Sequence, residues 1–302
     1  GDKGQLKSSN GDITYILDTI KENNVTIHFT KELPKNINDL FTAVVDSKLR
    51  KRIESNHSAT HLLHQALRQI LGNHVEQKGS SVQSKNLRFD FSHYEKISDI
   101  QLSEIEFFVN SKIEDQISLI ENREVPMQDA IDNGAIALFG EKYDDVVRTI
   151  KFGDSVELCG GTHVKNTAEI WQFKIKSEGA IASGIRRIEA ITGSAVKDYY
   201  NQSIIQLAEI RKSLNNTKNP VDSLAELKNE NLKLKKQLEA LSNDKLLNIR
   251  DSLINELKNV NGVNFLVKKV DLDVSNIKKL SFELGSIQKN LFIIFMTENN
   301  SK

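Results

Sequence analysis

The first part of the chain alternates short apolar stretches with turn residues. Residues 13–17, 25–29 and 41–45 are rich in β-branched and aromatic side chains, and an Asn-Gly-Asp turn precedes the first of them. Runs of this kind, bounded by turn residues, are typical of strands and hairpins. The pattern therefore predicts a small β-barrel or sheet domain over residues 1–48.

The period of the apolar residues changes at residue 55. From there they recur three and four positions apart, as on one face of a helix, with Ser55-Asn56 as the expected N-cap and Gly72 as the end. A second helical pattern covers residues 98–122, and Pro126 shortly after it interrupts any continuation of the helix.

Strand patterns surround these two predicted helices. Residues 87–91 alternate with period two, which predicts a half-buried strand, and further strands are predicted over residues 146–152, 156–158 and 170–175. Helices and strands of this kind predict a mixed α/β domain over residues 49–195.

The last third of the chain is rich in Lys, Asn, Glu and Leu. A helix is predicted to about residue 214, then a loop, then a long helix that Gly262 closes. Its apolar positions form a heptad seam with one polar member: Leu224, Leu227, Asn231, Leu234, Leu238 and Leu241. The seam favours either a helical hairpin that pairs its own arms or a dimerising coiled coil over residues 196–260. The pattern over residues 261–302 predicts two strands around a helix near 275–289. These elements would form a short C-terminal α/β domain, which we expect to be truncated. The fold class expected for the whole chain is α+β.

Composition narrows the possible functions. Lys plus Arg equals Asp plus Glu, 41 against 41 in 302 residues, so RNA contact would have to come from local patches or from shape. No apolar run reaches the roughly 18 residues of a membrane span, and no signal peptide is present. The single cysteine excludes an intramolecular disulfide and suits a reducing, cytoplasmic setting. Because the chain opens Gly1-Asp2-Lys3-Gly4 without an initiator Met, we expect it to be a fragment.

Two pairs of side chains carry the spacing of metal ligands. His57 and His61 are four apart on one predicted helix face, and Cys159 and His163 flank a Gly-Gly loop that can fold tightly. Taken singly, a lone cysteine is more often a core residue, and the histidine pair is as often surface as ligand. Together they supply four nitrogen and sulfur donors suited to tetrahedral Zn²⁺, so we expect a zinc site. The other histidines, including the competing ligand His64, are expected to be ordinary surface or core residues.

Six motifs in a fixed order add a family resemblance. They occupy residues 56–64, 77–80, 87–93, 137–143, 157–163 and 183–190. This series resembles the editing domain of alanyl-tRNA synthetases. The opening residues resemble the β-barrel that precedes that domain, and the helical hairpin and last domain resemble the family's C-terminal region, which contributes to dimerisation and tRNA contact.

The resemblance implies specific roles for site residues. It implies that the four residues named above bind zinc, with Cys159 essential, and that Gln77 lines the amino-acid pocket. Thr60 is expected to touch the serine hydroxyl, and Gly161 to help form the pocket. Arg186 and Arg187 would shape the pocket or meet the tRNA end, with a structural ion pair as an equal alternative. No acidic residue forms a His-Glu-x-x-His arrangement with the histidine pair, so no general base is assigned.

The implied function is hydrolysis of tRNA(Ala) mischarged with serine or glycine. The parent enzyme would attach alanine to tRNA(Ala) using ATP, through upstream aminoacylation domains absent here. Zinc would either activate a water molecule or anchor the substrate. The expected partners are the mischarged tRNA(Ala), the upstream domains, and a second copy bound through the C-terminal helices, but no membrane.

Three alternatives stay open. The first is a freestanding trans-editing protein, which the missing initiator Met disfavours. The second is a tRNA-binding and dimerisation module with structural zinc, in which loss of Cys159 would unfold the domain. The third is a zinc-free interaction protein, which elemental analysis would reveal.

Overall fold

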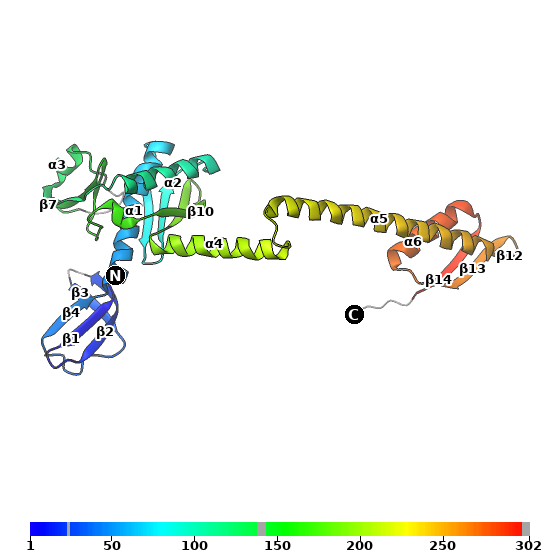
Figure 1. Cartoon of the computed structure of the whole chain (residues 1–302), viewed down its shortest axis with the longest axis horizontal. Coiled ribbons are helices and arrows are strands. Elements are labelled where there is room, and N and C mark those ends of the chain that lie inside the picture. Colours follow the sequence, from blue (N-terminus) through cyan, green and yellow to red (C-terminus); the bar gives the residue numbers. More distant parts are fainter. Residues whose placement is uncertain (23–24, 138–142, 298–302) are drawn as a thin grey trace. The chain divides into compact units, whose positions relative to one another are not determined.

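The computed structural model describes residues 1–22, 25–137 and 143–297 of the chain. These residues divide into two compact units, Gly1–Ile205 and Gln206–Lys302, each described here by itself (Figure 1). Each unit combines helices with sheets, so the predicted α+β class is confirmed. No helix of the described part is both long and apolar enough to cross a membrane.

The first unit begins with a four-stranded antiparallel sheet, in the order β3-β2-β1-β4. Its strands are β1 (Gly4–Ser8), β2 (Ile13–Glu22), β3 (Val25–Thr30) and β4 (Phe41–Val45). The three predicted strands are confirmed. The pattern missed β1 because Leu6 is the single apolar side chain in that strand.

Helix α1 (Ser47–Leu71) carries the first histidine pair. It begins well before the predicted start, because Asp46 caps it by accepting the backbone N–H groups of Lys48 and Leu49. The predicted N-cap at Ser55-Asn56 is therefore wrong, and both residues are buried inside the helix. Gly72 does end the helix, with φ at 118°.

A second four-stranded antiparallel sheet packs against α1 and α2 (Asp99–Glu114), in the order β10-β11-β6-β5. Its strands are β5 (Gln77–Val82), β6 (Leu87–Ser92), β10 (Phe173–Ala182) and β11 (Ile185–Thr192). The main core forms between this sheet and the two helices, with Leu62, Leu63, Phe89 and Ile188 fully buried. Burial at these positions holds α1 firmly in place.

Helix α2 ends at Glu114 rather than at the predicted residue 122. Gln116 takes a positive φ of 51°, which a helix cannot continue through, and the chain then enters a strand. That strand belongs to a third sheet, ordered β7-β8-β9. The elements of this region are β7 (Ile120–Pro126), α3 (Met127–Asp132), β8 (Val146–Phe152) and β9 (Ser155–Leu158).

Residues 170–175, predicted as one strand, are divided in the structure. A short 3₁₀ helix, η1 (Thr167–Ile170), comes first, Trp171 follows with φ at 67°, and β10 starts only at Phe173. Of the motif at residues 137–143, positions 138–142 lie outside the described residues.

The rest of the chain contains α4 (Ser194–Ser213), in which the boundary between the two units falls, and the long α5 (Pro220–Asn255). A three-stranded sheet, β12-β13-β14, packs with α6 and the end of α5 around Leu253, Leu280 and Leu284. The remaining elements are β12 (Lys258–Val260), β13 (Val263–Lys269), α6 (Val274–Ile287) and β14 (Leu291–Met296). Gly262 does not close α5 as predicted; it lies in the turn between β12 and β13, with φ at 87°.

Candidate metal centre

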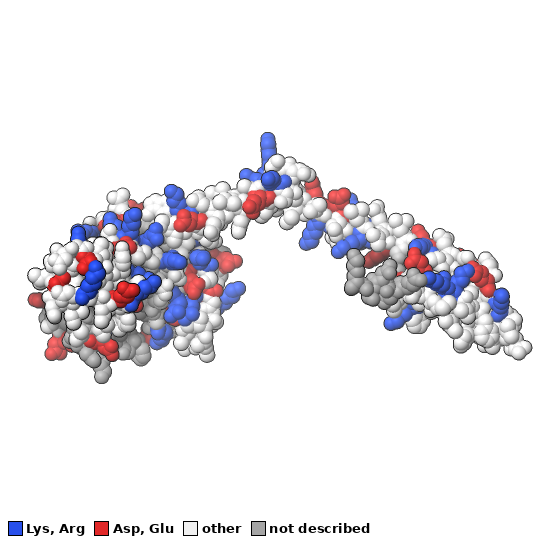
Figure 2. Space-filling model, turned by 90° about the horizontal axis from the view of Figure 1, so that it is seen from below, with Lys and Arg blue, Asp and Glu red and all other residues white. Residues whose placement is uncertain are grey.

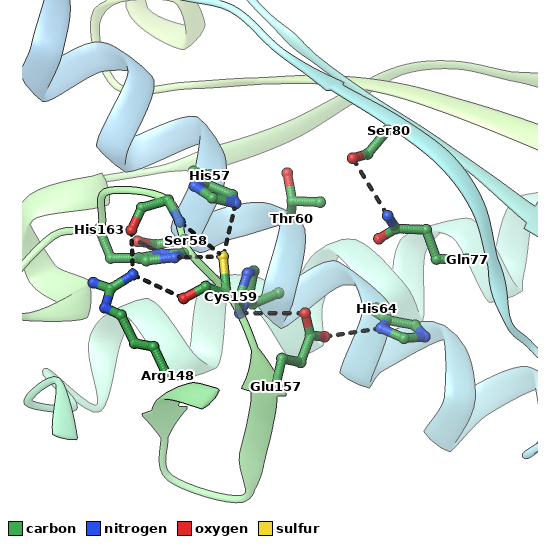
Figure 3. A network of polar contacts seen from close by, with 12 residues as sticks. His57, Ser58, Thr60, His64, Gln77, Ser80, Arg148, Glu157, Cys159 and His163 are labelled. Carbon is green, nitrogen blue, oxygen red and sulfur yellow. Dashed lines mark hydrogen bonds and ion pairs between the residues drawn. The ribbon is translucent and has the colours of Figure 1, made fainter. Parts of the chain in front are cut away.

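The two separate ligand pairs of the sequence meet at one point of the first unit. His57 and His61 project from α1, while Cys159 follows β9 and His163 ends the loop after it. Figure 3 shows His57, Cys159 and His163 turned toward one another. The donor atoms of all four side chains lie within 4.8 Å of one another. Strand β9 pairs with β8, and this pairing holds the cysteine loop against the helix.

Two of the distances between the donor atoms match those around one tetrahedral ion. The Cys159 sulfur lies 3.5 Å from His57 Nε2 and 3.3 Å from His163 Nε2. Four donors about 2.0–2.3 Å from one zinc ion would stand about 3.3–3.8 Å apart. Three nitrogens and one sulfur are also the donor types that zinc prefers.

The second nitrogen of each ligand histidine faces a partner. His57 Nδ1 lies 3.1 Å from the Thr162 carbonyl oxygen, which can only accept, so Nδ1 carries the proton and Nε2 is left bare. His163 Nδ1 lies 3.1 Å from the Ser58 hydroxyl. His61 Nδ1 lies 3.3 Å from Glu157 Oε2, at ion-pair distance but without hydrogen-bond alignment. Partners of this kind orient imidazoles toward a metal.

Burial keeps these imidazoles neutral. It lowers the pKa of His61 to about 3 and that of His163 to about 2, and it lowers the pKa of His57 as well. A neutral imidazole has a free lone pair, which metal binding requires. The three histidines are therefore in the protonation state of ligands at neutral pH.

Arg148, on β8, fixes the cysteine loop. Its Nη1 donates to the carbonyl oxygens of Cys159 and Gly161 at 2.8 and 2.6 Å, and its Nε donates to Glu121 at 2.8 Å.

The two glycines of the loop, Gly160 and Gly161, differ in the space around them. A Cβ at Gly161 would lie 2.2 Å from the His57 ring, whereas one at Gly160 would meet nothing within 4 Å. The loop and α1 thus approach closely only because residue 161 is glycine.

His64 lies outside the metal-ligand group, which consists of the side chains of His57, His61, Cys159 and His163. The Nδ1 of His64 lies 2.8 Å from Glu157 Oε1 (Figure 3). Because the other carboxylate oxygen lies against His61, the two histidines share the buried Glu157 side chain. Burial raises the pKa of Glu157, but the two imidazoles more than offset this, and the pKa lies below its ordinary value. The net result is an ionised carboxylate behind one of the ligand histidines. His74 and His93 contact each other on the surface, and His28 contacts Thr19.

The predicted substrate contacts have varied surroundings. Thr60 is buried, and its hydroxyl donates to the Asn56 carbonyl oxygen. Gln77 is half-buried and reaches Ser80 at 3.4 Å, apart from the sulfur and its histidines in Figure 3. Arg186 pairs with Glu178, and Arg187 makes a two-fold ion pair with Asp90 at 2.6 and 2.8 Å. Both arginines therefore have the structural ion pairs of the alternative interpretation, and their roles toward substrate stay predictions.

A cleft of about 580 Å³ opens beside the metal-ligand group. His57, Gly161 and Thr162 line one part of it, and Ile53, Gln83 and residues 1–3 line others. Asp2, at its edge, receives the Nε–H of Arg50 on α1 at 2.6 Å. The cleft gives a small organic ligand access to one of the ligand histidines.

Sequence reasoning missed the residues that support the ligands. Ser58 contacts His163 and also accepts the backbone N–H of Val164 at 3.1 Å, while Glu157 and Arg148 act as described above. Glu157 stands two positions before Cys159 and Ser58 directly follows His57, so proximity to a ligand was the available signal. The position of Arg148 in the sequence, 11 residues before Cys159, gives no sign that it contacts the cysteine loop.

Comparisons with known proteins relate the chain to one group of enzymes by sequence. Residues 147–189 match the family described as "Threonyl and Alanyl tRNA synthetase second additional domain". The alanine–tRNA ligase of Christiangramia forsetii is 56% identical over 302 residues, which cover 100% of this chain and 35% of that protein. Those of Flavobacterium psychrophilum and Bacteroides fragilis are 52% and 42% identical, covering 97% and 100% of this chain and 34% and 35% of theirs. The chain thus spans about a third of the length of these relatives, and the resemblance inferred from the motifs is confirmed.

Proposed function

We propose that this chain, a homologue of alanine–tRNA ligases that carries the second additional domain, hydrolyses the ester of tRNA(Ala) mischarged with serine or glycine. The observation that carries the proposal is the His₃Cys group beside a cleft of ligand size. A second hydrolytic site of this kind answers a physical problem. A pocket for alanine rejects serine, which adds one hydroxyl, by only about 10².

The side chains of this chain would divide the work of holding the ion and receiving the ester. His57, His61, Cys159 and His163 would bind zinc, which when present supplies Lewis-acid chemistry toward a carbonyl or a water molecule. Glu157 and Ser58 would keep two of the imidazoles oriented, and Arg148 would keep the loop closed through its carbonyl oxygens. The cleft lined by Gly161 and Thr162 would receive the aminoacyl end. No side chain is assigned as general base.

The test is release of serine from seryl-tRNA(Ala) by the purified 302-residue chain. We expect hydrolysis of the seryl ester, little hydrolysis of alanyl-tRNA(Ala), and loss of hydrolysis in Cys159→Ala with the fold retained. A folded, zinc-loaded chain that leaves the seryl ester intact would contradict the proposal for this chain.

A second candidate is a tRNA-binding module with structural zinc. One observation favours it: the four side chains together can satisfy a tetrahedral ion with no position left over. It predicts that Cys159→Ala lowers the unfolding temperature sharply. The thermal stability of that variant, measured beside its hydrolysis rate, therefore separates the two functions.

A further inference from the structure

A hollow of about 480 Å³ lies where α1, η1 and the start of α4 meet in the first unit. Its walls combine cations with one large aromatic ring. The main lining side chains are Lys51 and Arg52 of α1, Trp171 after η1, and Lys197 of α4. None of the lining residues belongs to the metal-ligand group.

The cations of this hollow outnumber its acidic residues. Lys51, Arg52 and Lys197 are exposed, and within the described part of the chain none of them forms an ion pair. The one acidic residue of the lining, Glu169, is already engaged, since it accepts the backbone N–H groups of Lys165 and Asn166 at 3.1 and 3.3 Å. Glu169 keeps its negative charge, and the lining thus has three cations against one carboxylate: a local positive site on a chain whose formal net charge is zero.

Trp171 is held in this hollow against ordinary conformational preference. It is the only tryptophan of the chain, it is 55% exposed, and its φ is 67°. A bulky residue at positive φ is unusual, and such strain tends to persist where it has a use. Tight turns on either side, Trp171 N–H to Ala168 and Gln172 N–H to Ile170, fix it there. Core packing does not explain a ring that is kept at the surface.

The first turn of α4 adds to the positive potential. Ser194, the first residue of this 20-residue helix, lines the hollow, and Gly193 before it has φ at 56°. Unpaired N–H groups at a helix start attract anions. The N–H groups at the start of α4 add to the attraction for an anion that the three cations provide. They do not define the site by themselves.

We propose that this hollow binds RNA, with backbone phosphates on Lys51, Arg52 and Lys197 and an unpaired base stacked on Trp171. Cations that track phosphates beside an exposed aromatic ring are the usual means of binding single-stranded nucleic acid. The inference rests on the proposed function for its RNA partner. It adds a place for that partner away from the metal-ligand group: at about 100° per residue, Arg52 leaves α1 on the side opposite to His57 and His61.

The fluorescence of the full chain tests this directly, because all tryptophan emission comes from Trp171. Titration with a 12-nucleotide single-stranded RNA and with uncharged tRNA(Ala) transcript should change the emission, with an affinity that falls as salt rises. Emission that stays constant while a labelled RNA is shown to bind elsewhere would overturn the proposal. So would binding to anionic phospholipid vesicles with no binding to either RNA.

Variants locate the contacts. The triple change Lys51→Ala, Arg52→Ala and Lys197→Ala should weaken RNA binding more than tenfold and reduce the salt slope by about 2, the value for three contacts to a single strand. Trp171→Ala should weaken binding about tenfold, and Trp171→Phe, which keeps a ring, should retain most of the binding.

A charge-matched control replaces three exposed lysines outside the hollow, Lys96, Lys151 and Lys176. Equal losses in the control and the hollow variants would contradict the assignment.

A minimal substrate separates this inference from the proposed function. Seryl-adenosine carries the ester but no phosphate chain, so hollow variants should hydrolyse it at the rate of the unmodified chain, with unchanged zinc content. They should hydrolyse seryl-tRNA(Ala) more slowly at limiting concentration. A chain that binds RNA through the hollow but hydrolyses neither ester would retain this inference and reject the editing activity. Hydrolysis of seryl-tRNA(Ala) that is insensitive to all hollow variants would do the reverse.

Discussion

At the scale of single residues, the metal-ligand group depends on the absence of one carbon atom. A Cβ on Gly161 would lie 2.2 Å from the His57 ring, so Gly161→Ala must displace that imidazole or the loop. We expect it to lower zinc affinity at least about tenfold, the scale seen when ligand orientation is disturbed. Competition with a chromophoric chelator measures this.

Gly160→Ala is the matched control, because a Cβ there meets nothing within 4 Å. It should leave zinc affinity close to that of the unmodified chain. Equal zinc affinities for the two variants would show that the close approach of the loop to His57 does not matter.

Glu157 supports a second residue-scale prediction. Its carboxylate lies against His61 and His64, so Glu157→Gln removes the negative charge behind a ligand imidazole while keeping the side chain's shape. Zinc affinity should fall about 10- to 100-fold. Glu124→Gln, at an exposed position of β7, serves as the control. An affinity unchanged by Glu157→Gln would mean that the carboxylate only fills space.

The group of three histidines and one cysteine could be predicted from sequence because two short spacings, in a helix and in a glycine loop, report local geometry. The supporting residues could not. Arg148 reaches the carbonyl oxygens of Cys159 and Gly161 across a β8–β9 pairing that no spacing reveals. The sharing of Glu157 by two histidines likewise arises only when β9 packs against α1.

At the scale of elements, the row of exposed leucines along α5 is the surface whose role can be tested most directly. The heptad leucines are exposed, Leu234 at 55% and Leu238 at 70%, so within the second unit they make little contact with its core. We expect the chain to self-associate through this seam. The change Leu234→Asn with Leu238→Asn should then shift sedimentation equilibrium toward monomer at tens of micromolar.

The alternative to self-association is a hairpin within one chain. In that case the double variant would lower the helix content of a chain that is monomeric throughout. Lys235→Gln with Lys236→Gln, two exposed changes on the same helix outside the leucine seam, controls for the effect of substituting this helix at all. A strict monomer with unchanged stability in all variants would leave the seam without a role.

Sequence patterns located most elements but placed several of their ends wrongly. Helix α1 starts early because the Asp46 cap outweighs the Ser55-Asn56 signal, and α2 stops early at the positive φ of Gln116. Strand β1 has too few apolar residues to produce an alternation. In the two helices a local side-chain cap and a single backbone angle, rather than periodicity, decide the boundary.

At the scale of the whole molecule, charge gives no guide to the RNA partner. Figure 2 shows Lys and Arg mixed with Asp and Glu over the face in view, as the balance of 41 against 41 implies. Any RNA contact must therefore be local, and the hollow around Trp171 is the place that we propose. The proposed reaction depends on the metal-ligand group, so hydrolysis of the minimal substrate seryl-adenosine and RNA binding should respond to different variants.

The most direct test of the proposed function is reconstitution of metal-free chain. The chelator-treated protein would be given increasing zinc, and release of serine from seryl-tRNA(Ala) would be measured at each step. We expect no hydrolysis without zinc, a linear rise, and a plateau at one equivalent per chain, with no response in Cys159→Ala. Full hydrolysis by the metal-free chain, or none at one bound equivalent in the folded chain, would contradict a zinc-dependent editing site.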